Sequence, residues 1–207
     1  MPRPLPPGFI APCLATRADR VPAGPQWAHE IKHDGYRFIA RREGERVRVF
    51  SRRGLDWTDR VPTIVAAMQA LKARSAVIDG EAVVARDDGV TDFGQLRSAL
   101  ASRNGGSAAV FLYAFDLIEI DGRDMRRHPW HARSDALAKL LHDAPAGIVL
   151  SEHFDGNGAM MFRHACTLGL EGIVSKRRDA PYRSGRCADW IKVKNPHAPA
   201  ATRVMEW

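Results

Sequence analysis

The sequence predicts an α+β fold, in which antiparallel hairpins and separate helices share one domain. Residues 38–40 and 47–50 are apolar or alternate between apolar and charged, and they flank a short turn at 43–45. This pattern predicts a β-hairpin with one buried face. Apolar residues recur at helical spacing over 61–73, which predicts an amphipathic helix. Strands and helices do not alternate regularly further along, which argues against a parallel βαβ sheet.

The remaining elements follow from the same patterns. Seven prolines in residues 1–26 fix φ and remove backbone donors, so we expect an extended lead-in packed on the domain. The domain itself is expected to span 27–195, followed by a tail at 196–207. Further helices are expected at 93–103 (ending at 104–106), 133–142 and 157–168. Strands are expected at 77–78 and 82–84, on either side of Asp79-Gly80-Glu81, and at 110–118, 148–150, 172–175 and 190–193, with a loop at 177–189.

Composition narrows the class of protein. The chain has 31 Lys+Arg against 24 Asp+Glu, a net charge of +7, which favours a polyanionic partner, with nucleic acid as the first candidate. No apolar run approaches the roughly 20 residues of a transmembrane helix, and the N-terminus lacks the apolar core of a signal peptide. Three widely spaced cysteines indicate a reducing compartment. We therefore expect a cytoplasmic protein with no membrane partner.

The segment from Glu30 to Arg37 contains the pattern Lys-x-Asp-Gly-x-Arg, which begins at Lys32. A glycine turn leading into a strand would hold this lysine at the wall of a cleft. A lysine becomes a nucleophile when it loses its proton, and burial or neighbouring cations promote that loss. Taken alone, the pattern is equally explained by a surface lysine before a β-turn.

Further charged and aromatic segments accompany this lysine. They are Ser51-Arg52-Arg53-Gly54, Asp79-Gly80-Glu81, Tyr113-Ala114-Phe115-Asp116, Glu171-Gly172-Ile173-Val174-Ser175-Lys176 and Asp189-Trp190-Ile191-Lys192-Val193-Lys194. Period-two alternation puts Lys192 and Lys194 on one face of a strand. Two neighbouring ammonium groups repel unless an anion lies between them, and a chain of phosphates would fit that place.

The order and spacing of these motifs, from about Trp27 to Asn195, resemble the nucleotidyltransferase core of the ATP-dependent DNA ligases. The likeness is greatest to the ligase module of bacterial end-joining ligases. It implies an ATP-grasp-like core of mostly antiparallel sheets flanked by helices. It also implies a reaction in DNA repair: a lysyl-AMP forms, AMP passes to the 5′-phosphate of nicked DNA, and the 3′-hydroxyl seals the nick.

Carried over residue by residue, the resemblance first assigns the nucleotide contacts. Lys32 matches the nucleophile that attacks the α-phosphate of ATP. Glu30 matches the family's contact to adenine, and Phe115 matches the aromatic residue that stacks on the base. Arg37 and Arg52 match arginines that face the ribose and the phosphates.

The resemblance also assigns the groups around the reacting phosphates. Glu81 matches a carboxylate near the ribose and the metal, and Glu171 matches the carboxylate associated with a catalytic Mg²⁺ or Mn²⁺. Lys176, Lys192 and Lys194 match lysines near the phosphates. Cations, metal-binding carboxylates and a flat apolar surface are what attack on a nucleoside triphosphate requires.

Ligases of this family continue into an OB-fold domain, but only 13 of the 207 residues follow Lys194. We therefore expect this chain to lack that domain, and we expect a separate OB-domain or end-joining protein to supply it. Two other functions stay open: an RNA ligase or guanylyltransferase of the same superfamily, and a noncatalytic module that binds nicks or ends.

Two remaining patterns carry less weight. His128 and His131 have a metal-like interval, but Pro129 between them prevents the helix that would align the two rings, so we expect no metal site there. Arginines at 177, 178, 183 and 186 are compatible both with contacts to DNA phosphates and with a solvated loop.

Overall fold

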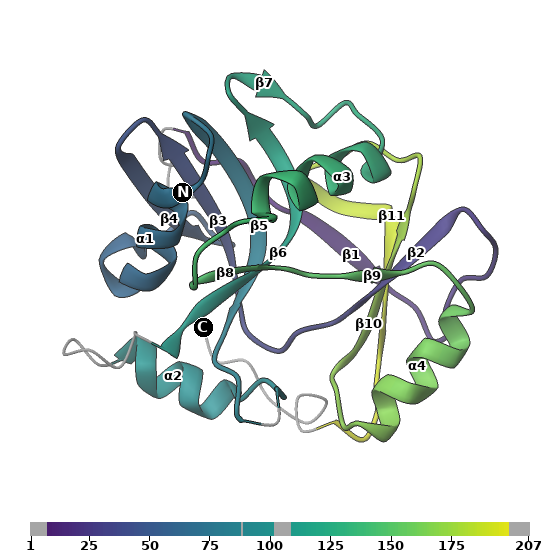
Figure 1. Ribbon diagram of the computed structural model, residues 1–207. Coiled ribbons are helices and arrows are strands. Elements are labelled where there is room, and N and C mark those ends of the chain that lie inside the picture. The colour runs from purple at the N-terminus through teal and green to yellow at the C-terminus, as the bar shows by residue number, and fades with distance from the viewer. Residues whose placement is uncertain (1–7, 88, 102–108, 199–207) are drawn as a thin grey trace, which may run out of the picture.

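The computed structural model describes residues 8–87, 89–101 and 109–198. Two sheets pack against each other, and helices lie on the outer sides (Figure 1). The five-stranded sheet has the order β1 (Cys13–Arg17), β11 (Gly185–Lys194), β10 (Gly172–Arg177), β2 (Trp27–Ile31) and β9 (His153–Phe154). The six-stranded sheet has the order β4 (Arg46–Ser51), β3 (Tyr36–Glu43), β5 (Ser75–Val83), β6 (Phe111–Ile120) and β7 (Arg123–Asp124), with β8 (Ile148–Leu150) also paired to β6.

Four α-helices and one 3₁₀ turn complete the described fold. The helices α1 (Pro62–Ala70), α2 (Phe93–Ala101) and α3 (Trp130–Leu141) pack on the six-stranded sheet, and the turn η1 (Thr58–Arg60) precedes α1. On the other side of the molecule, α4 (Gly158–Thr167) packs on β2 and β10. Within the described residues no helix combines the length and apolar character needed to cross a bilayer.

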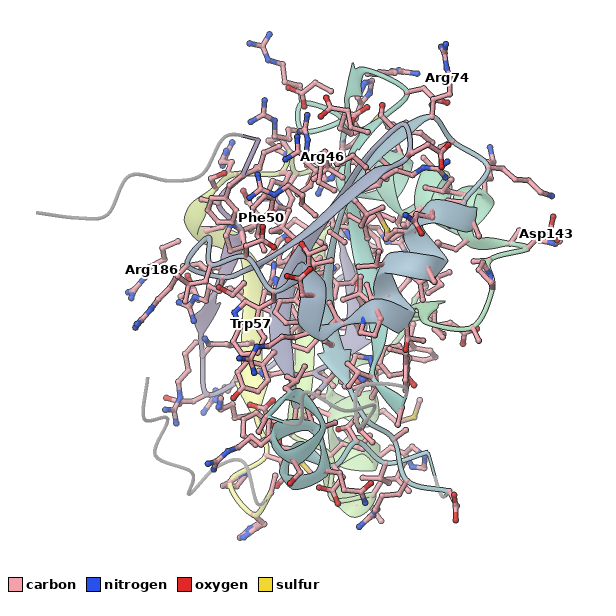
Figure 2. All side chains as sticks on the ribbon, turned by 90° about the vertical axis from the view of Figure 1, so that its left-hand side faces the viewer. Arg46, Phe50, Trp57, Arg74, Asp143 and Arg186 are labelled. Atoms are coloured by element: carbon pink, nitrogen blue, oxygen red, sulfur yellow. The ribbon has the colours of Figure 1, made fainter. Side chains whose placement is uncertain are left out.

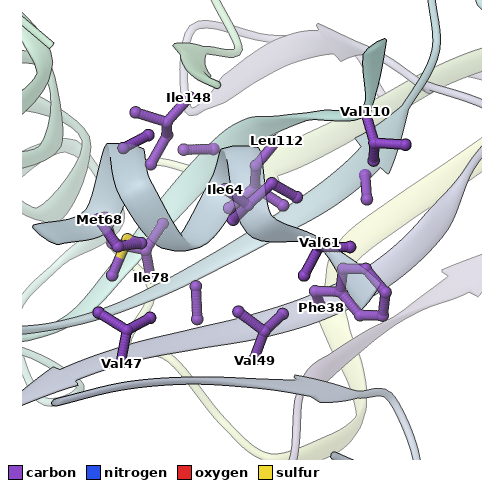
Figure 3. Packing of buried hydrophobic residues seen from close by; sticks show 14 of the residues in the cluster. Phe38, Val47, Val49, Val61, Ile64, Met68, Ile78, Val110, Leu112 and Ile148 are labelled. Atoms are coloured by element: carbon purple, nitrogen blue, oxygen red, sulfur yellow. The ribbon is translucent and has the colours of Figure 1, made fainter. Parts of the chain in front are cut away.

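The six-stranded sheet is buried on both faces. Along β3, Phe38 points toward the helices, whereas Ile39 points toward the second sheet. Figure 3 shows the helix-side core, in which Ile64 and Met68 of α1 lie over residues of the sheet such as Val49. Because side chains alternate along its strands, one face of this sheet packs against the helices and the opposite face packs against the five-stranded sheet. Charged residues also lie on this second face.

The α+β class and the mainly antiparallel pairing are confirmed, and several element boundaries were wrong. The segments expected at 77–78 and 82–84 are joined in one continuous strand, β5 (Ser75–Val83), within which Gly80 passes so close to β6 that an added Cβ would lie 2.7 Å from the carbonyl oxygen of Tyr113. Helix α3 begins at Trp130, since Pro129 serves as its N-cap. The expected loop at 177–189 is shorter, because β10 continues to Arg177 and β11 begins at Gly185.

The lead-in contains one element that its prolines conceal. A proline-free stretch forms β1, which pairs in parallel with β11 at the edge of the five-stranded sheet. Helix α1 ends at Ala70, three residues before the expected end of that helix. The expected end of the second helix at 104–106 and most of the tail lie outside the described residues.

Candidate active site

Three strand ends converge next to Lys32. Its backbone N–H donates to the carbonyl of Gly172, at 3.0 Å, and the N–H of Asn195 donates to the carbonyl of Glu171, at 2.9 Å. Gly172 is also the register partner of Lys194 across β10 and β11. The chain segments at the end of β2, the start of β10 and the end of β11 therefore meet. Their meeting brings Lys32, Glu171 and Lys194 together, although Lys32 is far from the other two in the sequence.

Two glycines permit this close approach of backbones. A Cβ on Gly35 would lie 2.1 Å from the carbonyl oxygen of Ala82, so the turn after Lys32 can pass against β5 only without a side chain. Gly172 has φ of +137°, and a Cβ there would lie 2.1 Å from the carbonyl oxygen of Val193. The glycines of the two sequence motifs thus have a steric reason to stand beside Lys32 and Glu171.

The charged groups at these strand ends form a cluster. The Nζ of Lys32 lies 2.5 Å from Oε2 of Glu171, and the Nζ of Lys194 lies 2.8 Å from Oε1 of the same carboxylate. Burial alone would raise the pKa of Glu171, but the ammonium groups of Lys32 and Lys194 outweigh this effect and hold the pKa below its ordinary value. Glu171 is therefore an ionised carboxylate shared by two lysines.

Lys192 and Arg52 add positive charge to the cluster. Partial burial lowers the pKa of Lys192, and the nearby charges of Lys32, Lys194 and Arg52 lower it further. Lys192 and Lys194 thus lie on the same side of β11, as the alternation predicted. The exposed Arg52 lies at the periphery of the cluster. An excess of cations over carboxylates makes this place suited to a polyanion.

Glu81 of β5 is the second carboxylate at the cluster. Burial raises its pKa to about 7, and the charges of Lys32 and Arg37 oppose that rise while Glu171 adds to it. A carboxyl group held in this way gains from any additional cation. The part of the chain that the structure describes contains no group of three His, Cys, Asp or Glu residues placed to hold a metal ion by themselves.

At the other end of the site, the rings of Phe115, Trp130 and Trp190 surround the ammonium group of Lys176 and form an aromatic pocket that this group occupies. Lys176 is 1% exposed, and its Nζ lies 2.7 Å from Oε1 of Glu30 and donates to the carbonyl of Phe115 at 2.9 Å. The same ammonium lies 4.6 Å from the ring centroid of Phe115 and 4.2 Å from that of Trp190. Burial raises the pKa of Glu30, and the Lys176 ammonium opposes that rise.

Arg37 lies between the aromatic pocket and the charged cluster. Its guanidinium donates to both oxygens of Asp79, at 2.6 and 2.7 Å, and its Cζ lies 4.5 Å from the ring centroid of Phe115. It also acts electrostatically on Glu81. The planar guanidinium is therefore held in place between the aromatic ring of Phe115 and the charged cluster.

The structure thus brings the sequence-predicted residues to one site between the two sheets, but Lys176 lies in a different part of that site from the one expected. Lys176 lies apart from Lys194: it pairs with Trp190, four residues along β11 from Lys194, a separation of about 13 Å at 3.3 Å per residue. Its burial against Glu30 and the aromatic rings does not support the expected phosphate role. It places Lys176 beside the surface on which a base would stack.

Residues 12–194 match the family model of the ATP dependent DNA ligase domain. The chain belongs to this family. The multifunctional non-homologous end joining protein LigD of Pseudomonas aeruginosa is 37% identical over 189 residues, which cover 91% of this chain and 22% of that protein. The corresponding LigD of Mycobacterium tuberculosis is 36% identical over 190 residues, 90% of this chain and 24% of that protein.

Solved structures agree with this family membership. The ligase domain of M. tuberculosis LigD superimposes with a TM-score of 0.76 at 34% identity, and the match covers 89% of this chain and 60% of that chain. A Chlorella virus DNA ligase-adenylate, at 18% identity and a TM-score of 0.65, shares the fold. The nucleotidyltransferase fold expected from the motifs is thereby confirmed. The chain spans about a quarter of the length of these LigD relatives.

Several residues of this ligase-family site have no role in the sequence prediction. His33 stacks on Tyr113 with ring centroids 3.8 Å apart, and burial, together with the charge of Lys32, lowers its pKa to about 4. Asp79 binds Arg37, and Tyr182 donates to Asp79. Lone residues such as Tyr182 give no sequence signal, because their partners lie on distant strands.

The two remaining sequence patterns are the histidines at 128 and 131 and the late arginines at 177, 178, 183 and 186. His131 binds the backbone of Arg178, and His128 contacts Arg123, so the two histidines have different partners. Among the late arginines, those at 177, 178 and 183 form ion pairs with neighbouring aspartates. Arg186 is exposed and points away from the body of the molecule (Figure 2).

Proposed function

We propose that this chain is the catalytic core of an ATP-dependent DNA ligase, with Lys32 as the nucleophile. The observation that carries the proposal is the Lys32–Glu171–Lys194 cluster, which adjoins Arg37 and the aromatic pocket around Phe115. Such a site offers a nucleophile, cations for phosphate oxygens and a flat surface for a base. A relative of known structure, mycobacterial DNA ligase D, was determined in complex with ATP.

In the proposed first step, Nζ of Lys32 attacks the α-phosphorus of ATP. A P–N bond forms, the bond to the β-phosphate oxygen breaks, and pyrophosphate leaves with the electron pair. The attacking nitrogen must first lose a proton, and Oε2 of Glu171 at 2.5 Å is the atom placed to accept it. In this proposal Lys192 and Lys194, which lie beside Lys32 and Glu171, compensate the negative charge that develops on the phosphates.

We propose that the base stacks on Phe115 near Glu30 and Lys176, and that Arg37 contacts the ribose side of the nucleotide. The indole N–H groups of Trp130 and Trp190 are buried without a hydrogen-bond acceptor in the described structure, both beside Lys176. Buried donors of this kind leave hydrogen-bonding capacity that a polar ligand can use. We propose that Arg52, at the edge of the charged cluster, contacts a phosphate.

Glu81 and Glu171 are the carboxylates that would hold Mg²⁺ or Mn²⁺. Both face Lys32, and Mg²⁺ is commonly held by one or two carboxylates together with substrate phosphates and water. The donor set therefore fits such an ion. When bound, the ion would polarise phosphoryl oxygens and neutralise charge on the leaving pyrophosphate.

We further propose nicked double-stranded DNA as the substrate that receives AMP on its 5′-phosphate and is sealed by its 3′-hydroxyl. The LigD relatives are end-joining proteins, and the matched ligase-domain structures are longer than this chain. We propose that an OB-fold domain, or an end-joining partner, completes the DNA-bound state. A cytoplasmic location stays a prediction of the sequence.

Incubation with α-labelled ATP and a divalent cation, followed by denaturing electrophoresis, tests the proposal. Wild-type protein should retain label from ATP and not from GTP, Lys32→Ala should retain none, and Lys72→Ala, which removes an exposed lysine on the far surface, should behave as wild type. No label in the wild type, alone or with an added OB-domain protein, would contradict the enzyme function and favour a noncatalytic binding module. Pre-adenylated nicked DNA and RNA then separate the substrates: sealing of RNA alone would contradict DNA ligation.

A further inference from the structure

Tyr182 lies in the short connection between β10 and β11 and is 4% exposed. Its hydroxyl donates to Oδ2 of Asp79 at 2.5 Å and accepts from the backbone N–H of Cys13 at 3.0 Å. The phenol oxygen therefore makes one bond as a donor and one as an acceptor, on two different strands. Such a buried and satisfied hydroxyl is costly to remove, because its partners cannot turn to water instead.

Both partners of Tyr182 also hold Arg37. Asp79 is fully buried and accepts two hydrogen bonds from the guanidinium, and the carbonyl of Cys13 accepts a third from Nη2 at 3.0 Å. Every hydrogen bond that the structure describes for this guanidinium thus ends on a residue that Tyr182 contacts.

The bonds around Tyr182 also join the two sheets. Arg37 and Asp79 belong to β3 and β5 of the six-stranded sheet, whereas Cys13 belongs to β1 of the five-stranded sheet. The Tyr182 ring packs edge-on against Trp190, with ring centroids 6.0 Å apart. Its backbone N–H donates to the carbonyl of Arg126 at 2.8 Å, so the ring itself is held in place.

We propose that Tyr182 is a positioning residue, which holds Asp79 and the backbone of Cys13 so that the Arg37 guanidinium stays against Phe115 at the nucleotide site. The proposal rests on the proposed function. Burial, reinforced by the charge of Asp79, raises the pKa of Tyr182 well above its ordinary value, so the hydroxyl keeps the proton that it donates.

Tyr182→Phe removes the hydroxyl and leaves the packed ring. One hydrogen bond contributes about 0.5–1.5 kcal/mol, so we expect a roughly 2- to 13-fold rise in the ATP concentration that half-saturates lysyl-AMP formation, with little change in the maximal rate. Thr16→Val is the control: its hydroxyl donates to the carbonyl of Cys187 at 2.9 Å, between β1 and β11, and it does not hold Arg37. Equal effects of the two variants would overturn the proposal.

A double variant separates positioning from general structure. If Tyr182 acts through Arg37, then adding Tyr182→Phe to Arg37→Ala should produce no further change in half-saturation. If half-saturation in the double variant instead rose by the product of the two single effects, Tyr182 would act independently of Arg37, and the proposal would be overturned.

A measurement without nucleotide distinguishes failure of this inference from failure of the proposed function. Hydrogen exchange of the Arg37 Nε–H, followed by NMR, should accelerate in Tyr182→Phe and stay unchanged in Thr16→Val. Unaltered exchange in Tyr182→Phe would refute the positioning role even if the wild type forms lysyl-AMP. Absence of lysyl-AMP in the wild type contradicts the proposed function, whereas faster exchange still shows that Tyr182 positions Arg37.

Discussion

The ammonium group of Lys32 lies 2.5 Å from Oε2 of Glu171, although 139 residues separate the two in the sequence. The side chain of Lys32 is 21% exposed and that of Glu171 only 6%, so the pair sits at the wall of the site with its lysine open to one side. Lys194 holds the other oxygen of the same carboxylate. Glu171 thus joins the proposed nucleophile to the strand that carries Lys192 and Lys194, the lysines proposed to bind phosphate.

Lys192 and Lys194 should respond differently to replacement by alanine. No hydrogen bond or ion pair of the Lys192 side chain occurs among the described residues, and burial and like charges disfavour its ammonium form. Lys192→Ala should therefore lower the rate of lysyl-AMP formation at least about tenfold with little loss of stability.

Lys194→Ala should lower the rate of lysyl-AMP formation as well, and it should also cost about 1–2 kcal/mol of unfolding free energy, between the values for exposed and buried ion pairs. Thermal unfolding alongside the labelling assay checks both, and a large loss of stability in Lys192→Ala would indicate a structural role.

Replacement of Lys176 by methionine should be strongly destabilising. It leaves Glu30, which is 3% exposed, without its ammonium partner, and breaking a buried pair costs about 3–5 kcal/mol. The double variant Glu30→Gln with Lys176→Met removes both charges and should regain much of that loss. Urea denaturation measures the three free energies of unfolding. A loss below about 1 kcal/mol in the single variant would show that the pair is unimportant to the fold.

The half-buried carboxyl of Glu81 should make stability depend on pH. Its pKa in the folded protein is about 7 against an ordinary value of 4.5, so between these pH values the folded state holds a proton that the unfolded state has lost. The free energy of unfolding therefore falls as the pH rises from about 4.5 to 7. Glu81→Gln should gain stability over the wild type at pH 8 and much less at pH 5, while it loses activity.

Melting temperatures of wild type and Glu81→Gln at the two pH values test this expectation. His33, with its pKa lowered to about 4, contributes stability above pH 6.5 that is lost as the pH falls, but it does so in both proteins and cancels in the difference. An equal difference in melting temperature at pH 5 and pH 8 would contradict a raised pKa for Glu81.

Much of the fold was predictable, because local patterns carry it. The hairpin of β3 and β4 follows from alternation around a two-residue turn, and the four helices lie close to the positions that their apolar spacing predicts. The errors fall where tertiary contacts outweigh local preference. Apolar residues mark only two short segments, at 77–78 and 82–84, yet pairing of β5 with β3 and β6 on both sides keeps Asp79, Gly80 and Glu81 between them extended as well.

The candidate site divides in the same way. Its residue types, from the Lys-x-Asp-Gly-x-Arg pattern to the alternating lysines of β11, were set by the sequence and identified the family. Tertiary structure decided their partners: Glu171 with Lys32, Glu30 with Lys176, and Tyr182 with Asp79, which lie 139, 146 and 103 residues apart. Alternation along a strand determines which face a side chain takes, because it depends only on backbone geometry. Which charge is neutralised by which depends on which distant strands pair and on how the two sheets pack, and no local pattern contains that information.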